Sequence, residues 1–288
     1  MQTAQGILDY LLEQGQDWVD PERTNDRILY GPGEREVSSA VVVWQPTARV
    51  IHRARELACQ LIVSHEPLFW RVRGNEGGDV RDEEAQAKKE RLLDESGITV
   101  IRCHDVWDRY PELGIAPSWA ANLGFEDYRI CDYWDGKIFA LCEFEPAKKL
   151  VEVAQTIAER TAWLGQQAVT VMGDPDMEIS RFTLNIGAWG GSFRHLKDAR
   201  DRHGSQGAAI TEFNWWTSPM WALDTGFGLI GCNHGVSESP GMRSLAEYLG
   251  KVFPDLTFTH VPEAAPYLMV GSDGPVTGRT CLDSWETL

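Results

Sequence analysis

The chain has 288 residues, of which 43% are hydrophobic and 24% are charged, as in globular proteins with a sizeable core. Its formal charge at pH 7 is −16, and a field of that sign repels phosphates, which argues against nucleic acids and anionic membranes as partners. The first residues lack the basic and apolar regions of a secretory signal, and no apolar run reaches the about 18 residues of a membrane span.

The cysteines indicate a reducing compartment. The six thiols form no CxxC pair and no dense framework. Several lie inside apolar runs, where a cysteine behaves as a small buried hydrophobe. We therefore expect free thiols and a cytoplasmic protein.

Helices and β-branched strands alternate through the first half of the chain. Pro46 and Thr47 can open a helix, Gly97 can stop one, and Asp135 with Gly136 is typical of a hairpin turn. Helices are predicted at 3–14, 46–59, 81–97 and 116–125, and strands at 38–45, 60–65, 98–105, 128–134 and 137–144.

The second half repeats this alternation. Helices are predicted at 146–160, 192–204 and 240–253, and strands at 168–173, 180–189, 207–213, 226–234 and 256–261. Continuous apolar strands between helices are typical of a largely parallel or mixed sheet covered on both faces, so we expect an α/β fold. The residues after about 270 are polar and weakly patterned and are expected to form an arm.

Three clusters of potential metal ligands follow predicted strands. They are His65 and Glu66 after the apolar run at 61–63, His104, Asp105 and Asp108 after the run at 98–102, and His234 and Glu238 after the run at 228–232. In open α/β sheets the ligand crevice lies outside the carboxyl ends of the strands, so the clusters could converge there.

Each cluster also has a purely structural interpretation. A histidine at a strand end is commonly a hydrogen-bonded structural residue, and Asp108 could cap a turn. Glu238 could stabilise the first turn of a helix, and Pro240 suggests that a helix begins close by. His234 and Glu238, four residues apart, share one face if that turn is helical. The coincidence of three clusters at equivalent positions is what favours a metal site.

Four segments resemble one family in its order along the chain. They are "VVVWQPTARVIHRARELACQLIVSHEPLFW" at 41–70, "CHDVWD" at 103–108, the glycine-rich "NIGAWGGSF" at 185–193 and "NHGVSESPGMRSLAEYL" at 233–249. The family is that of the GTP cyclohydrolase I type two homologues, the Nif-three-like dinuclear metal-centre proteins.

The resemblance implies two intertwined α/β halves with mixed sheets, assembled as a homo-oligomer such as a hexamer. We place the halves at 1–130 and 131–270, the second returning His234 and Glu238 to the site, and an arm at 271–288. The resemblance also implies that His65, Asp108, His234 and Glu238 are metal ligands. His104 matches a histidine that lines the site.

The chain departs from the family pattern at three places. Glu66 replaces the second histidine of a His-His pair, Asn233 replaces a glycine, and an Asp-Asn motif is unclear in the segment 24–33. As a fifth ligand, Glu66 would favour Mn²⁺, Fe²⁺ or Mg²⁺ over Zn²⁺. Alternatively, Glu66 is a general base beside a single ion, or it forms a salt bridge with Arg71 or Arg73.

These observations predict a metal-dependent hydrolase with one or two Mn, Fe, Zn or Mg ions per chain. Its substrate would be a small molecule with an amide, a cyclic amide or a nucleotide-like ring, attacked by metal-activated water. Glu66 or His104 would shuttle the proton. GTP cyclohydrolase activity is not favoured, because the sequence contains no obvious basic cluster that could bind a triphosphate. The alternative is a non-catalytic metal-binding oligomeric scaffold or regulatory protein.

The twelve tryptophans allow two interpretations. Trp44 and Trp70 lie beside strand ends that carry the clusters, and Trp215, Trp216 and Trp221 precede the third cluster. They could form an aromatic wall around a flat substrate, or they could pack in the core or at a subunit interface.

Overall fold

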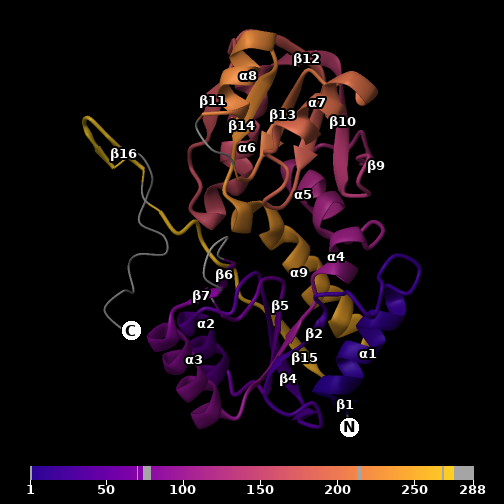
Figure 1. Ribbon diagram of the computed structural model, residues 1–288, viewed down its shortest axis with the longest axis vertical. Helices are drawn as coiled ribbons and strands as arrows, with labels where there is room; N and C mark the ends of the chain where they lie inside the picture. The colour runs from indigo at the N-terminus through magenta and orange to yellow at the C-terminus, as the bar shows by residue number, and fades with distance from the viewer. Residues whose placement is uncertain (1, 70, 74–78, 213–215, 268, 276–288) are drawn as a thin grey trace. The chain divides into compact units, whose positions relative to one another are not determined.

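Two separate mixed sheets form from the apolar runs of the sequence (Figure 1). The computed structural model describes residues 2–69, 71–73, 79–212, 216–267 and 269–275. The chain divides into two units, the first comprising Met1–Tyr110 and Met242–Pro262, and the second Pro111–Gly241 and the described residues from 263 onward. Because the chain leaves the first unit and later returns to it, the two α/β halves are intertwined, as expected.

The first unit is built on a five-stranded sheet of order β15-β4-β5-β8-β2. All neighbours are parallel except the edge strand β2, which is antiparallel to β8. The elements are α1 (Ala4–Gln14), α2 (Ala48–Glu56), α3 (Glu83–Ser96), α4 (Asp105–Arg109), β2 (Arg27–Tyr30), β4 (Ser39–Val43), β5 (Leu61–Ser64), β8 (Thr99–Arg102) and β15 (Thr257–His260). Short pairs are β1 (Gln2–Thr3) with β3 (Glu36–Val37), and β6 (Arg71–Arg73) with β7 (Asp79–Arg81).

The predicted helix signals work as expected in this unit. Thr47 caps α2, its hydroxyl accepting a hydrogen bond from the Val50 amide at 3.3 Å. Gly97 ends α3 in the left-handed conformation at φ 63°. Figure 1 shows α2 and α3 on one side of the sheet and α1 on the other. Alternate strand residues such as Val41 and Ile62 form a core with α2 and α3, so both faces are covered.

The second unit contains a six-stranded sheet of order β11-β14-β13-β12-β10-β9. Its central pairs β12/β13 and β13/β14 are parallel, and the others are antiparallel. The elements are α5 (Ile115–Leu123), α6 (Leu150–Thr161), the 3₁₀ turn η1 (Ala162–Leu164), α7 (Phe193–His203), α8 (Ser218–Thr225), β9 (Tyr128–Asp132), β10 (Ile138–Lys149), β11 (Thr170–Met172), β12 (Glu178–Asn185), β13 (Gly207–Ile210), β14 (Gly228–Gly231) and the pair β16 (Val270–Gly271) and β17 (Gly274–Pro275).

Helices cover both faces of this sheet as well. Leu229 packs with residues of α7 and α8 in one cluster. The neighbouring Gly228 instead faces Leu150 of α6. Because consecutive strand residues point to opposite faces, α6 lies on the face opposite to α7 and α8.

Boundaries differ from the predicted ones at three places. The chain divides after Tyr110, and not after residue 130, because α5 contacts β9, β10 and β12 of the second sheet. Residues 146–149 extend β10, so α6 begins at Leu150. Helix α9 (His234–Val252) begins before Pro240, which lies inside it. The reason is Asn233, whose side-chain oxygen accepts a hydrogen bond from the Val236 amide at 3.1 Å and so starts the helix earlier.

His195 is buried although it lies on the charged helix α7. This histidine is 5% exposed, and its Nε2 lies 3.1 Å from an oxygen of Asp135 in the hairpin turn. The rings of Tyr133, Trp134 and Trp189 surround it at centroid distances of 4.7–5.0 Å. Part of the tryptophan excess is therefore structural.

The cysteines are free thiols where the structure describes them, as expected. Five cysteines within the described residues are free, and the sixth, Cys281, lies outside them. In the part of the chain that the structure describes, no helix is long and apolar enough to cross a membrane.

Acid should weaken the first unit through His260, at the end of β15. Burial, helped by the charge of Arg243, lowers its pKa to about 4. In the unfolded chain a histidine has a pKa of about 6.5. The contribution of His260 to folding stability is therefore fully present above that pH, and it is lost as the pH drops toward about 4. We expect protonation of His260 alone to lower the free energy of unfolding by up to about 3 kcal/mol over that range.

Urea unfolding of the metal-free protein across this pH range measures the effect. His260→Asn should flatten the decline, whereas the control His52→Asn should not. Equal slopes for the wild type and His260→Asn would contradict the assignment.

Candidate metal centre

Parallel pairing of β5 and β8 brings the first two clusters together. Ser64, the last residue of β5, pairs with Arg102, the last residue of β8. The Cys103 amide then donates to the Ser64 carbonyl at 2.8 Å, which extends the pairing past both strands. His65 and His104 therefore follow neighbouring strand ends, and their rings stack at a centroid distance of 4.4 Å.

The orientation of His65 is that of a metal ligand. Its side chain is fully buried, and its Nδ1 lies 3.2 Å from the Cys103 carbonyl oxygen. A carbonyl only accepts, so this nitrogen carries the proton and Nε2 of the neutral ring keeps the lone pair. Nε2 lies 3.4 Å from a carboxylate oxygen of Asp108. Fixing one ring nitrogen on a backbone carbonyl is the common way in which proteins orient a ligating histidine.

His104 is held between two carboxylates. Its Nδ1 lies 2.7 Å from Asp105 and 3.5 Å from Asp108. Burial opposes a charge on this ring, but the Asp108 and Asp105 carboxylates outweigh it and raise the pKa of His104 to about 9. In the metal-free protein the protonated, positively charged form of the His104 ring is therefore favoured.

Asp26 organises the loop that carries this cluster, and sequence reasoning missed it. One carboxylate oxygen accepts from the His104 amide and, at 3.1 Å, from that of Asp105, while the other accepts from the Val106 amide at 2.8 Å. The side chain is 3% exposed, and its burial raises its pKa despite these bonds. The amide of Asn25 adds a 2.8 Å bond to Asp105. The only signal was the Thr-Asn-Asp triplet at 24–26, whose similarity to the family motif was unclear.

Glu66 has a different ionic partner from those predicted. Its Oε2 lies 3.4 Å from Nη2 of Arg102, and both side chains are largely buried. Arg102 also donates to the His65 carbonyl at 2.7 Å. Burial lowers the pKa of Arg102, while Glu66 and the nearby aspartates act to raise it. The predicted partners Arg71 and Arg73 have side chains outside the described part.

The second unit carries a matching histidine and carboxylate at the start of α9. His234 Nε2 lies 3.0 Å from Glu238 Oε1, which confirms that the i, i+4 pair shares one helical face. His234 Nδ1 lies 2.8 Å from Glu212, just beyond β13, and this bond lowers the pKa of Glu212. Glu238 is 1% exposed. Glu212 was not predicted, although an acid near the end of the strand predicted at 207–213 was a usable signal.

Both groups have spacings that fit a divalent ion. Ions bound to nitrogen and oxygen at about 2.1 Å hold their donors about 3–4 Å apart. The His65–Asp108, His104–Asp108 and His234–Glu238 distances fall in this range. In the first unit, one donor atom from each of His65, His104 and Asp108 lies within 4.8 Å of the other two.

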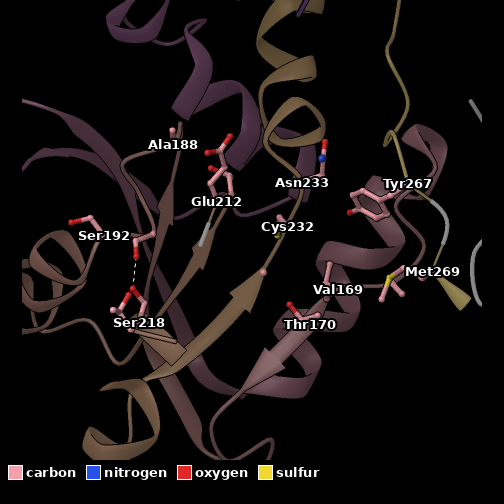
Figure 2. Close-up of a pocket in the computed structure, with 15 residues that line it drawn as sticks. Val169, Thr170, Ala188, Ser192, Glu212, Ser218, Cys232, Asn233, Tyr267 and Met269 are labelled. Atoms are coloured by element: carbon pink, nitrogen blue, oxygen red, sulfur yellow. Dashed lines mark hydrogen bonds between the residues drawn. The ribbon is translucent and has the colours of Figure 1, made fainter. Parts of the chain in front are cut away.

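A cavity of about 680 Å³ lies beside Glu212 in the second unit (Figure 2). It opens at the carboxyl ends of β13 and β14, the position at which α/β sheets bind ligands. Its walls include Ala188 and Ser192 from the glycine-rich segment 185–193 and Cys232 and Asn233 after β14.

No tryptophan of the described residues lines this cavity, and Trp221 follows the core-packing interpretation. Trp221 packs against Phe193 and Phe227, as expected of core residues. Trp216 is 79% exposed and does not line the cavity. Trp70 and Trp215 lie outside the described residues.

Comparison with known families decides what kind of protein this is. The family model of Duf34/NIF3 (NGG1p interacting factor 3) matches residues 24–265. The chain belongs to this family. The match begins at Thr24, so it includes the segment that holds the His104 loop.

Solved structures share the fold of this Duf34/NIF3 member at low sequence identity. The Bacillus cereus protein related to NIF3 has a TM-score of 0.78 at 10% identity, covering 93% of this chain and 99% of that one. Staphylococcus aureus hypothetical protein SA1388 has 0.74 at 17%, with the same coverage. Reduced HcgD from Methanocaldococcus jannaschii has 0.65 at 16%, covering 90% and 97%. None of the curated proteins matches the sequence.

Asp26→Asn should destabilise the loop at 104–106 of this Duf34/NIF3 protein. The amide NH₂ would face backbone N–H groups that now donate to a carboxylate, which costs about 1–3 kcal/mol. Urea unfolding should show this loss, and binding of Zn²⁺ or Mn²⁺ should weaken about 10–100-fold. Asp17→Asn, an exposed substitution on the same unit, is the control. Unchanged stability and metal affinity would remove Asp26 from this role.

Proposed function

We propose that this Duf34/NIF3 protein is a divalent-metal-dependent hydrolase of small molecules with an amide, a cyclic amide or a nucleotide-like ring. One observation carries the proposal. In each unit a histidine has Nδ1 held by an oxygen acceptor and Nε2 within 3.4 Å of a carboxylate. This pattern of a fixed tautomer beside a carboxylate is typical of catalytic and structural metal sites.

The proposed ligands are the five residues implied by the sequence. His65 and Asp108 belong to the first unit, and His234 and Glu238 to the second. Glu66 is the fifth, and its ionic contact with Arg102 stabilises the negative charge that a ligand needs. That all five serve one dinuclear centre is our proposal from the family resemblance.

The metal would supply Lewis-acid chemistry: a bound divalent ion lowers the pKa of water and polarises a carbonyl. The protein's own side chains would transfer the protons. Asp105 accepts a hydrogen bond from Nδ1 of the His104 ring, so the proton that this ring can exchange is the one on Nε2. His104 or Glu66 could then take a proton from water and return it to the leaving nitrogen.

Metal content tests the ligand set. After reloading with Mn²⁺, Fe²⁺ or Zn²⁺, elemental analysis of the wild type should give about two ions per chain, as in dinuclear hydrolases. Glu66→Ala should bring this to about one, and the exposed control Glu13→Ala should leave it unchanged. An unchanged count in Glu66→Ala would assign Glu66 to proton transfer or to its pair with Arg102. A wild type that retains no ion would refute the proposal.

Turnover separates an enzyme from a scaffold. Glu238→Gln keeps the size of the side chain but removes a buried anionic ligand. The reloaded wild type should hydrolyse members of a panel of amides, cyclic amides and nucleotides, and the variant should lose at least about 100-fold in kcat/KM. Size-exclusion chromatography should give the same oligomer for both. If the metal-loaded wild type turns over no member of the panel, the protein is instead a metal-binding scaffold.

A further inference from the structure

The cavity beside Glu212 is lined entirely by the second unit. Its walls come from the entry to β11, the segment after β12, the ends of β13 and β14, the start of α8 and the chain after 265. Its volume of about 680 Å³ is within the range of small-molecule sites. Figure 2 shows Glu212 and Asn233 toward one end, with Ser192 and Ser218 on another wall.

The hydroxyl groups of the cavity act mainly as acceptors. Thr211 donates its proton to the Gly187 carbonyl at 2.8 Å, and Ser218 donates to that of Gly191 at 2.5 Å. Tyr267 donates to the Gln166 side-chain oxygen at 3.1 Å. Since each hydroxyl has only one proton, its oxygen can offer a ligand only lone pairs. The cavity therefore selects for N–H and O–H donors.

The charges of the lining side chains further restrict the class of ligand that the cavity can bind. Glu212 is the acidic side chain among the lining residues that the structure describes, and none of those residues is basic. The sequence places no lysine or arginine at 213–215 or 268 either. An anion such as a phosphate would meet a carboxylate without a neutralising side chain. Toward Ser192 and Ser218 the helices α7 and α8 begin, and their backbone N–H groups suit a neutral carbonyl oxygen.

Thr170 supplies a second observation that points to a ligand. Its hydroxyl oxygen is buried and has no hydrogen-bond partner in the described part of the chain, and the residue lines the cavity. Buried polar atoms are rarely left without a partner. Val169, Cys232 and Met269 provide apolar wall nearby, so the body of the ligand can be a ring or a short alkyl chain.

We propose that this cavity binds an uncharged carboxamide, with its N–H groups donating to Glu212 and to the acceptor hydroxyls. A molecule of this class presents donors and one carbonyl acceptor without a net charge, which matches both walls. The inference deepens the proposed function, on which it rests for the meaning of the site, because it selects amides from the proposed substrates. Binding itself needs no metal, so it can be tested separately.

The experiment uses the full chain after removal of metal. Saturation-transfer NMR titrations compare two matched pairs, nicotinamide with nicotinate and benzamide with benzoate. The amides should bind and the carboxylates should bind at least about tenfold more weakly. Glu212→Gln can still accept from His234 but lacks the charge, and it should weaken amide binding about 10–100-fold. Thr170→Val, nearly isosteric, should weaken it about 2–10-fold.

Glu159→Gln on α6 is the control, because it removes one exposed charge outside the cavity and should leave binding unchanged. Equal or tighter binding of the carboxylates would overturn the proposal. So would absence of amide binding up to the solubility limit, or amide affinities that neither Glu212→Gln nor Thr170→Val changes. If the metal-free chain binds the amides but the wild type retains no ion after reloading with Mn²⁺, Fe²⁺ or Zn²⁺, the cavity is supported and the hydrolase is refuted.

Discussion

The parallel pairing of β5 and β8 is the constraint on which the first ligand group depends. It places the Cys103 carbonyl where His65 can donate to it, and this bond turns the other ring nitrogen toward Asp108. A register shift by one residue would move His65 to the opposite face of the sheet. The buried valines and isoleucines of these strands oppose such a shift, because each would lose its packing partners and move to the opposite face of the sheet. The chemistry of the site is therefore fixed by apolar packing several residues away.

The two units orient their histidine rings with different hydrogen-bond acceptors. His65 is oriented by a backbone carbonyl, whereas His234 is oriented by the Glu212 carboxylate. A carboxylate makes the imidazole a stronger electron donor than a carbonyl does, so the two histidines should differ in basicity as ligands. Glu212 also borders the cavity, so under our two proposals one side chain would both orient a metal ligand and recognise a substrate.

The sequence was sufficient to predict most of the elements and the places where potential metal ligands gather. Periodicity located β4, β5, β8 and the helices α1 and α3, because apolar spacing is set by the local geometry of a strand or helix. It missed α4 and α8, which are short and rely on tertiary contacts. Asp26 and Glu212 were missed for a related reason. Each acts through a bond to a residue far along the chain, and a single sequence contains no signal for such a pairing. The charged sequence of α7 gives no sign that His195 is buried, because the rings that enclose it, such as those of Tyr133 and Trp189, lie outside that helix.

Arg102 gives the site a property that its acidic residues alone would not have. This side chain is 9% exposed and lies among carboxylates of Glu66, Asp26, Asp105 and Asp108, whose charges act on it. A permanent cation beneath the loop offsets part of their mutual repulsion, so the acids can remain gathered without an ion. We therefore expect the first unit to fold without a bound ion. An ion held at the centre that we propose could then be exchanged according to the metal supply, because the fold would not depend on it.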